Sequence, residues 1–158
     1  MKKLIVTSLF ALLISSCNNV NPKEIPNEVI VIVELIKNKE KSQEELKEFT
    51  KRYSDYVKST QPNTLGWTYH DAGDKIILIE RYKNEDANIV TAKNISPGGN
   101  RYELLQESFK YYTLGKVTVI GGFTQKLIDF NKMTAEKVGF TAPFVYHPLI
   151  SGYSKNLK

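Results

Sequence analysis

Residues 28–36, EVIVIVELI, form a nearly continuous run of apolar and mostly β-branched side chains. β-branched residues favour strands, and a strand with apolar side chains at successive positions needs cover on both of its faces. The run therefore predicts a central strand, with helices on one side of its sheet and further protein on the other. A symmetric second copy of the chain is the simplest cover for that other side, so we expect a homodimer.

Helical and strand patterns alternate after this run. Ser42 and Glu45 have the spacing of a capping box, in which each side chain satisfies a free backbone N–H group at a helix start. Alternating side chains at 64–71 and 75–82 flank a turn and predict a hairpin. The expected elements are a strand at 28–36, a helix at 42–60, strands at 64–71 and 75–82, a helix at 84–93, a helix that Asn100 caps and Gly115 ends, a strand at 116–120, a short helix around 127–130 and an extended tail at 143–153.

This order of elements predicts an α+β fold of the ferredoxin-like class. A strand, a helix, two strands, helices and a further strand make the split βαβ arrangement, with an antiparallel sheet and helices on one face. Residues 28–158 have the length of one domain, which includes the C-terminal extension. Pro148 in the extended tail cannot donate a backbone hydrogen bond, which favours a place at the edge of the sheet.

The first residues have the pattern of a bacterial export signal. Lys2 and Lys3 precede a short apolar stretch at 4–14, which is well below the roughly 20 apolar residues of a spanning helix. ISSC at 14–17 resembles the lipobox of bacterial lipoproteins, which implies cleavage before Cys17 and lipid attachment to its thiol. The alternative is an ordinary secretory signal with an incidental cysteine. We therefore expect a signal peptide at 1–16, a lipidated polar tether at 17–27 and a domain anchored to a membrane of the cell envelope, facing the periplasm or the cell exterior.

Composition excludes several other classes of function. Cys17 is the only cysteine, so no disulfide is expected and a packed core must supply the stability. Without Lys2 and Lys3, 20 basic residues face 17 acidic ones, and no basic cluster favours nucleic-acid binding. The two histidines have no spaced cysteine or carboxylate partner, so neither a metal nor another cofactor is expected.

Residues 29–94 resemble the antibiotic biosynthesis monooxygenase family, which includes quinol monooxygenases. The resemblance depends on PNTLGW at 62–67 and IERYKNEDA at 79–87, where the family shows P-G-x-x-x-Y and then E-x-W/Y followed by acids and an alanine. It implies a dimeric α/β barrel and oxidation by molecular oxygen without a cofactor. Thr91 stands where many members have a helix histidine, and Trp67 stands where a tyrosine is usual. The missing histidine argues against haem degradation and weakens the quinol monooxygenase interpretation.

A cofactor-free oxygenase must exclude water, orient an electron-rich ring and accept a proton from it. Residues of these kinds lie on the predicted hairpin and the helix after it. The catalytic candidates are Trp67, His70, Glu80 and Tyr82, and the pocket candidates are Tyr69, Leu78 and Thr91. Each has a structural alternative: the aromatic residues as core, Glu80 as the partner of an arginine or tyrosine, and His70 as a solvated strand end.

The sequence thus supports three hypotheses of different classes. The first is a cofactor-independent monooxygenase that acts on a quinol or polyphenolic molecule at the cell envelope. The second is a lipoprotein that binds a small aromatic molecule without turnover, which the replacement of histidine by Thr91 favours. The third is an interaction protein of the envelope, in which the C-terminal extension covers the sheet edge or docks a partner.

Overall fold

The computed structural model describes residues 27–152, which form five strands and four helices. In chain order these are β1 (Val29–Lys37), α1 (Gln43–Thr60), β2 (Thr64–Ala72), β3 (Lys75–Tyr82), α2 (Glu85–Lys93), α3 (Tyr102–Ser108), β4 (Tyr112–Gly121), α4 (Gln125–Val138) and β5 (Phe144–Pro148). The order is that of an α+β ferredoxin-like fold, which confirms the predicted fold class.

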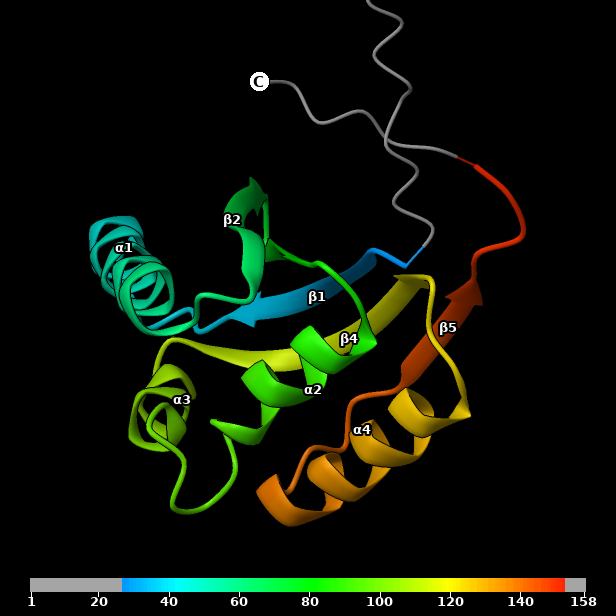
Figure 1. Ribbon diagram of the computed structural model, residues 1–158. Helices are drawn as coiled ribbons and strands as arrows, with labels where there is room; N and C mark the ends of the chain where they lie inside the picture. Colours follow the sequence, from blue (N-terminus) through cyan, green and yellow to red (C-terminus); the bar gives the residue numbers. More distant parts are fainter. Residues whose placement is uncertain (1–26, 153–158) are drawn as a thin grey trace, which may run out of the picture.

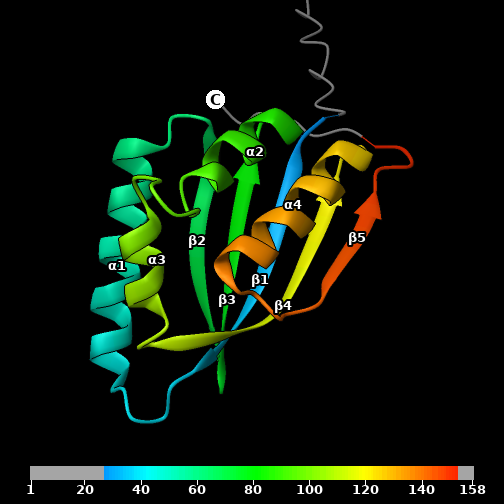
Figure 2. The same ribbon diagram turned by 90° about the horizontal axis from the view of Figure 1, so that it is seen from below.

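The sheet has the strand order β2-β3-β1-β4-β5, which can be followed from left to right in Figure 2. β1 lies at the centre, between β3 and β4, and is antiparallel to both. This place is the one that its apolar run predicted. β5 pairs with β4 in parallel, because α4 carries the chain back to the end of the sheet where β4 starts. The expected antiparallel sheet therefore holds for four strands, and β5 is a parallel edge strand that contains Pro148.

The two faces of the sheet differ in their cover. All four helices lie on one face, as Figures 1 and 2 show from two directions. Alternate side chains of β1 point to that face and are buried there, namely Val29, Val31, Val33 and Leu35. The other face carries five partly exposed isoleucines from three strands, which we call the isoleucine face: Ile30, Ile32, Ile77, Ile79 and Ile120. Residues 27–152 leave that face without the cover that the sequence predicted for it.

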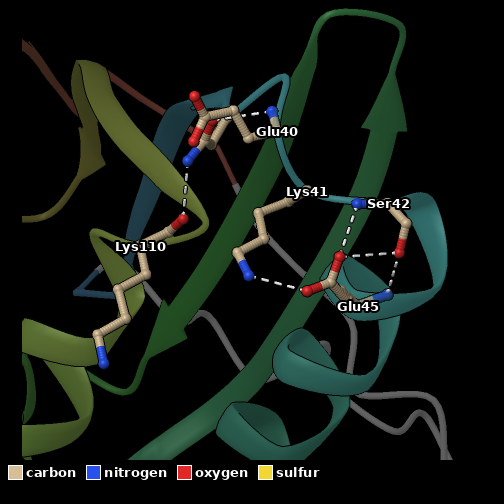
Figure 3. Close-up of polar contacts among 6 residues, drawn as sticks. Glu40, Lys41, Ser42, Glu45 and Lys110 are labelled. Atoms are coloured by element: carbon tan, nitrogen blue, oxygen red, sulfur yellow. Dashed lines mark hydrogen bonds and ion pairs between the residues drawn. The ribbon is translucent and has the colours of Figure 1, made fainter.

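The start of α1 has the predicted capping box (Figure 3). The Glu45 backbone N–H donates to the Ser42 hydroxyl oxygen at 3.2 Å, and the Ser42 N–H donates to Glu45 Oε2 at 2.9 Å. The ammonium of Lys41 donates to Glu45 Oε1 at 2.8 Å and, together with Ser42, lowers the pKa of Glu45 to about 2. Nearby, the Asn38 amide donates to the Lys110 carbonyl at 3.0 Å and joins the end of β1 to the start of β4.

Three predicted elements after residue 95 were wrong in extent, namely a helix, the strand after it and the last helix. The helix expected from Asn100 to Gly115 is shorter, since α3 ends at Ser108 and Tyr112 already begins β4. Pairing with the full length of β1 extends β4 backward, and Gly115 lies where the register shifts between Glu34 and Leu35. A Cβ on Gly115 would lie 3.2 Å from the Glu34 carbonyl oxygen, so glycine suits this irregular position.

The last helix is longer than the short one predicted around 127–130. α4 covers 14 residues and ends at Gly139, whose φ of 77° is the left-handed conformation that favours glycine. Asn131 and Thr134 are buried polar residues on its inner side. Because they interrupt the apolar stripe, the sequence pattern hid the second half of this helix.

None of the helices within residues 27–152 is long and apolar enough to cross a membrane. The predicted signal peptide at 1–16, the lipidation site at Cys17 and all of the predicted tether except its last residue lie outside the described residues.

Candidate functional site

A cavity of about 120 Å³ lies between the helix-covered face of the sheet and the helices. Its walls come from β1, β2, β3 and β4 on one side and from all four helices on the other. An apolar cavity of roughly 150 Å³ holds a benzene molecule, so this somewhat smaller space is at the lower limit for a single aromatic ring. Most of the lining is apolar, and a few polar side chains reach it from the hairpin, from the loop before α3 and from the helices, which is the usual composition of a small-molecule site.

Strand alternation brings two of the predicted aromatic residues to the cavity. Trp67 and Tyr69 occupy successive positions on the helix-covered face of β2 and both line the cavity. The Trp67 ring stacks on Tyr53 of α1, with ring centroids 5.8 Å apart and planes 10° apart. The Trp67 Nε1 and the Tyr69 hydroxyl are buried and have no hydrogen-bond partner among the described residues. A ligand in the cavity would therefore meet rigid rings that carry unused polar atoms.

Glu80 and Tyr82 lie two residues apart on β3 and both line the cavity. The Tyr82 hydroxyl donates to Glu80 Oε2 at 2.5 Å. The register places Glu80 between Val31 of β1 and Trp67 of β2. Burial raises the pKa of Glu80, and the positive charge of Arg101 and the hydrogen bond from Tyr82 oppose this effect. Burial, and then the charge of Glu80, raise the pKa of Tyr82 well above its usual range. A carboxylate with a raised pKa in a cavity can act as a proton acceptor.

Arg101 is the one basic residue among those that line the cavity, and the sequence analysis did not select it. Its side chain is buried, and its guanidinium carbon lies 5.0 Å from the Trp67 ring centroid and 5.9 Å from that of Tyr53. Nη2 donates to the Thr91 carbonyl at 3.2 Å, while Nε and Nη1 have no partner within residues 27–152. Such stacking of a guanidinium on aromatic rings is favourable, but it leaves the N–H groups unpaired.

The loop before Arg101 explains its position. The Arg101 backbone N–H donates to the Asn94 carbonyl at 2.9 Å, which folds the loop against the end of α2. A Cβ on Gly99 would lie 2.4 Å from that same carbonyl oxygen, so the close approach requires glycine there. The Gly98-Gly99 pair, which only Asn100 separates from Arg101 and the following helix, was the only local signal for this residue. It did not indicate where the side chain would point.

The structure brings five of the seven predicted site residues to one cavity. The other two, Thr91 and His70, lie outside its lining. Those five, all on the hairpin, are Trp67, Tyr69, Leu78, Glu80 and Tyr82. Thr91 is buried in α2 and outside the lining, and its contribution is the carbonyl that accepts from Arg101. His70 is exposed on the opposite face of the sheet, where its Nε2 lies 2.9 Å from the Thr68 hydroxyl oxygen. Since alternate strand residues point to opposite faces, His70 cannot reach the cavity that Trp67 lines.

The C-terminal part of the chain supplies a wall that the sequence analysis did not predict. Asn131 and Thr134 of α4 line the cavity, as do Phe140 and Phe144 after it. These residues lie beyond the segment that carries the family resemblance. The C-terminal extension, which the third hypothesis assigned to the sheet edge or to a docked partner, therefore encloses the site. Residues 27–152 contain no group of three or more histidine, cysteine, aspartate or glutamate side chains placed to hold a metal ion.

No family model and no curated protein matches the sequence. Among solved structures, the chain is similar to MupZ from Pseudomonas fluorescens, at 17% identity over 82% of this chain and 95% of that one, with a TM-score of 0.57. SnoaB, a cofactor-independent oxygenase from Streptomyces nogalater, matches at 15% identity over 62% of this chain and 92% of its own, with a TM-score of 0.49. Rv0793 from Mycobacterium tuberculosis matches at 16% identity over 61% and 96%, with a TM-score of 0.48. At these identities, the likeness to MupZ shows that the two chains share their fold.

Proposed function

We propose that this protein is a cofactor-independent monooxygenase that oxidises a quinol or a similar phenol in the cavity. The observation that carries the proposal is the partly buried Glu80 carboxylate, held by Tyr82 at 2.5 Å in an aromatic cavity of about 120 Å³. The family resemblance of residues 29–94 supports it independently of this geometry.

The reaction needs no reductant besides the substrate. A quinol and one molecule of oxygen give a hydroxyquinone and one molecule of water, so the quinol supplies all of the electrons. Glu80 accepts a proton from the quinol hydroxyl, which makes the ring a better electron donor. The Tyr82 hydroxyl holds the carboxylate in position, and the rings of Trp67 and Tyr53 orient the substrate and exclude water.

Oxygen uptake by the purified chain with a panel of hydroquinones tests this proposal. We expect turnover with single-ring quinols and a loss of about 100-fold or more in Glu80→Gln, because general base catalysis contributes roughly 10²–10⁴-fold. His70→Gln is the matched control, since His70 lies on the opposite face of the sheet and should be dispensable. Failure of every quinol to raise oxygen uptake, or loss of activity in the His70 variant alone, would contradict the proposal.

A binding protein without turnover is the second candidate. The replacement of the family's helix histidine by Thr91 favours it, as does the absence of Thr91 from the cavity lining. Stabilisation of the protein by a small aromatic molecule, without oxygen consumption, would support this function over the first.

We also propose that a second copy of the chain covers the isoleucine face. The patch is apolar at its centre, where Ile32 of β1 pairs with Ile79 of β3. At one end it is bounded by Glu34, which forms ion pairs with Lys75 at 2.8 Å and Lys116 at 2.7 Å. Ile32→Asp should convert a dimer into a monomer in analytical ultracentrifugation, whereas Met133→Asp on the exposed side of α4 should not. A wild-type chain that is monomeric at high concentration would refute this proposal.

Anchoring through Cys17 remains a proposal that depends on the sequence. Metabolic labelling with radioactive palmitate should label the wild-type chain and place it in the membrane fraction. Cys17→Ser should lose both the label and the membrane association. A labelled Cys17→Ser variant would show that the lipobox interpretation is wrong.

A further inference from the structure

We infer that the ligand of the cavity is a single-ring aromatic acid, whose carboxylate is bound by Arg101. This inference rests on the proposed function in taking the cavity as the substrate site. It goes further in naming the group by which the substrate is recognised.

The guanidinium of Arg101 is largely unpaired. Arg101 is 3% exposed, and its single hydrogen bond among the described residues joins Nη2 to the Thr91 carbonyl at 3.2 Å. Nε and Nη1 are buried without a partner. Buried donors of a charged group are costly to leave unpaired, and native proteins satisfy nearly all of them. An arginine held this way in the wall of a cavity indicates that the partner is a molecule that enters the cavity.

The cavity wall carries one acidic and one basic side chain. Glu80 is the one acidic residue among those that line the cavity, and it forms no ion pair with Arg101 within 4 Å. Its Oε2 already accepts the hydrogen bond from Tyr82. The guanidinium lies instead over the rings of Trp67 and Tyr53, whose centroids are 5.0 Å and 5.9 Å from its carbon. The positive charge is therefore not neutralised by direct contact, and an anionic group on the ligand would neutralise it.

Hydrogen-bond donors and an acceptor both line the cavity. The unpaired Nε1 of Trp67 belongs to the ring over which Arg101 lies, and both side chains line the cavity, so its wall contains unpaired N–H donors from two neighbouring residues. Glu80, on the neighbouring strand, supplies an acceptor. This arrangement fits a ring that carries a carboxylate for the donors and a hydroxyl for Glu80. The volume of about 120 Å³ restricts the ring system to one ring.

The test compares an acid with its neutral isosteres. Trp67 is the only tryptophan of the chain and lies in the cavity wall, so its fluorescence reports binding directly. The probes are 2,5-dihydroxybenzoate, 2,5-dihydroxybenzamide and hydroquinone. For the wild-type chain we expect the acid to bind at least about tenfold more tightly than either neutral compound. Equal affinities for the acid and the amide would overturn the inference.

Variants of Arg101 assign the preference to this side chain. Arg101→Met should remove the preference for the acid, and Arg101→Lys, which keeps the charge, should retain part of it. The matched control is Arg81→Met, because Arg81 is exposed on the opposite face and pairs with Glu28, so the preference should persist. If Arg101→Met does not fold, as judged by circular dichroism, two results still test the inference: the acid preference of Arg101→Lys, and the affinities of the wild-type chain for the acid and the amide. An acid preference that survives in folded Arg101→Met would overturn the inference.

Oxygen uptake in the same samples separates this inference from the proposed function. Selective binding of the acid without oxygen uptake would support the inference and contradict the monooxygenase proposal. Oxidation of hydroquinone with no binding preference for the acid would support the monooxygenase proposal and contradict the inference. Arg101 would then be assigned to the phenolate that forms during the reaction.

Discussion

Removal of one hydroxyl group from each of two cavity tyrosines should change the free energy of unfolding in opposite directions. Tyr82 is 1% exposed, and its hydroxyl donates to Glu80 Oε2 at 2.5 Å. A hydrogen bond to a charged group contributes roughly 1.5–3 kcal/mol, so Tyr82→Phe should destabilise the protein by about that amount at a pH where Glu80 is ionised. The Tyr69 hydroxyl is buried with no partner in the part of the chain that the structure describes. Tyr69→Phe removes this unpaired group and should stabilise the protein by about 1 kcal/mol.

The cost of Tyr82→Phe should increase with pH. Burial raises the pKa of Glu80 above its ordinary value of 4.5, and the hydrogen bond from Tyr82 limits the rise. Below that ordinary value Glu80 is protonated in the folded and the unfolded chain, so its burial has no charge penalty. As the pH rises, the unfolded chain releases the proton first, and stability falls until the pH passes the folded pKa. The variant lacks the hydrogen bond and has a higher folded pKa, so it loses more stability over this interval.

Urea denaturation measures these effects, with Trp67 fluorescence and circular dichroism as two probes of unfolding. The wild type and both Tyr→Phe variants are compared at about pH 4, below the ordinary pKa of Glu80, and at a series of higher pH values. In the Glu80→Gln background, the cost of Tyr82→Phe should no longer depend on pH. Equal costs for the two Tyr→Phe variants, or a Tyr82→Phe cost that does not change across the series, would refute the reasoning.

Three further predictions concern the fold around the site. Leu127 of α4 is fully buried, so Leu127→Ala should cost about 2–5 kcal/mol in urea denaturation, whereas Met133→Ala on the exposed side should stay within about 0.5 kcal/mol. Gly121 has a φ of 122°, and a Cβ there would lie 2.0 Å from the Glu28 carbonyl oxygen, so Gly121→Ala should lower the melting temperature and shift the β1 amide signals in NMR spectra. Ser42→Ala removes the capping hydroxyl of α1 and should cost about 1 kcal/mol, while an unchanged melting temperature would argue against the capping box.

The sequence predicted those parts of the fold that depend on local patterns. The run at 28–36 has a period and composition that only a central strand accommodates, and β1 is that strand. The capping box at Ser42 and the hairpin at 64–82 depend on residues within a few positions of one another, and both formed as predicted. Tyr112 was misplaced for the opposite reason. Its spacing from Leu105 and Phe109 suits a helix, but pairing with distant β1 makes it the start of β4.

The candidate site was predictable only where strand alternation determines a side chain's direction. Alternation placed Trp67 and Tyr69 on one face of β2 and His70 on the other, and the structure has them so. The pairing of β2 with β3 places Glu80 directly beside Trp67 on the same face of the sheet. No comparable rule applies to Arg101, which lies in a connection between helices. Its direction depends on the close contact of Gly99 with Asn94 and on the tertiary position of the Trp67 ring.

The buried side-chain polar atoms that lack a partner concentrate at the cavity rather than spread over the core. Among the described residues they belong to Trp67, Tyr69, Thr91 and Arg101. Three of these side chains line the cavity, and the carbonyl of the fourth accepts from Arg101. Each such group costs roughly 1–3 kcal/mol, a substantial part of the roughly 5–15 kcal/mol that stabilises a domain. A core selected for stability alone would have apolar side chains of similar size at these positions. Their presence in one cavity is therefore better explained by a ligand that satisfies them, and binding of that ligand should stabilise the fold in proportion to its affinity.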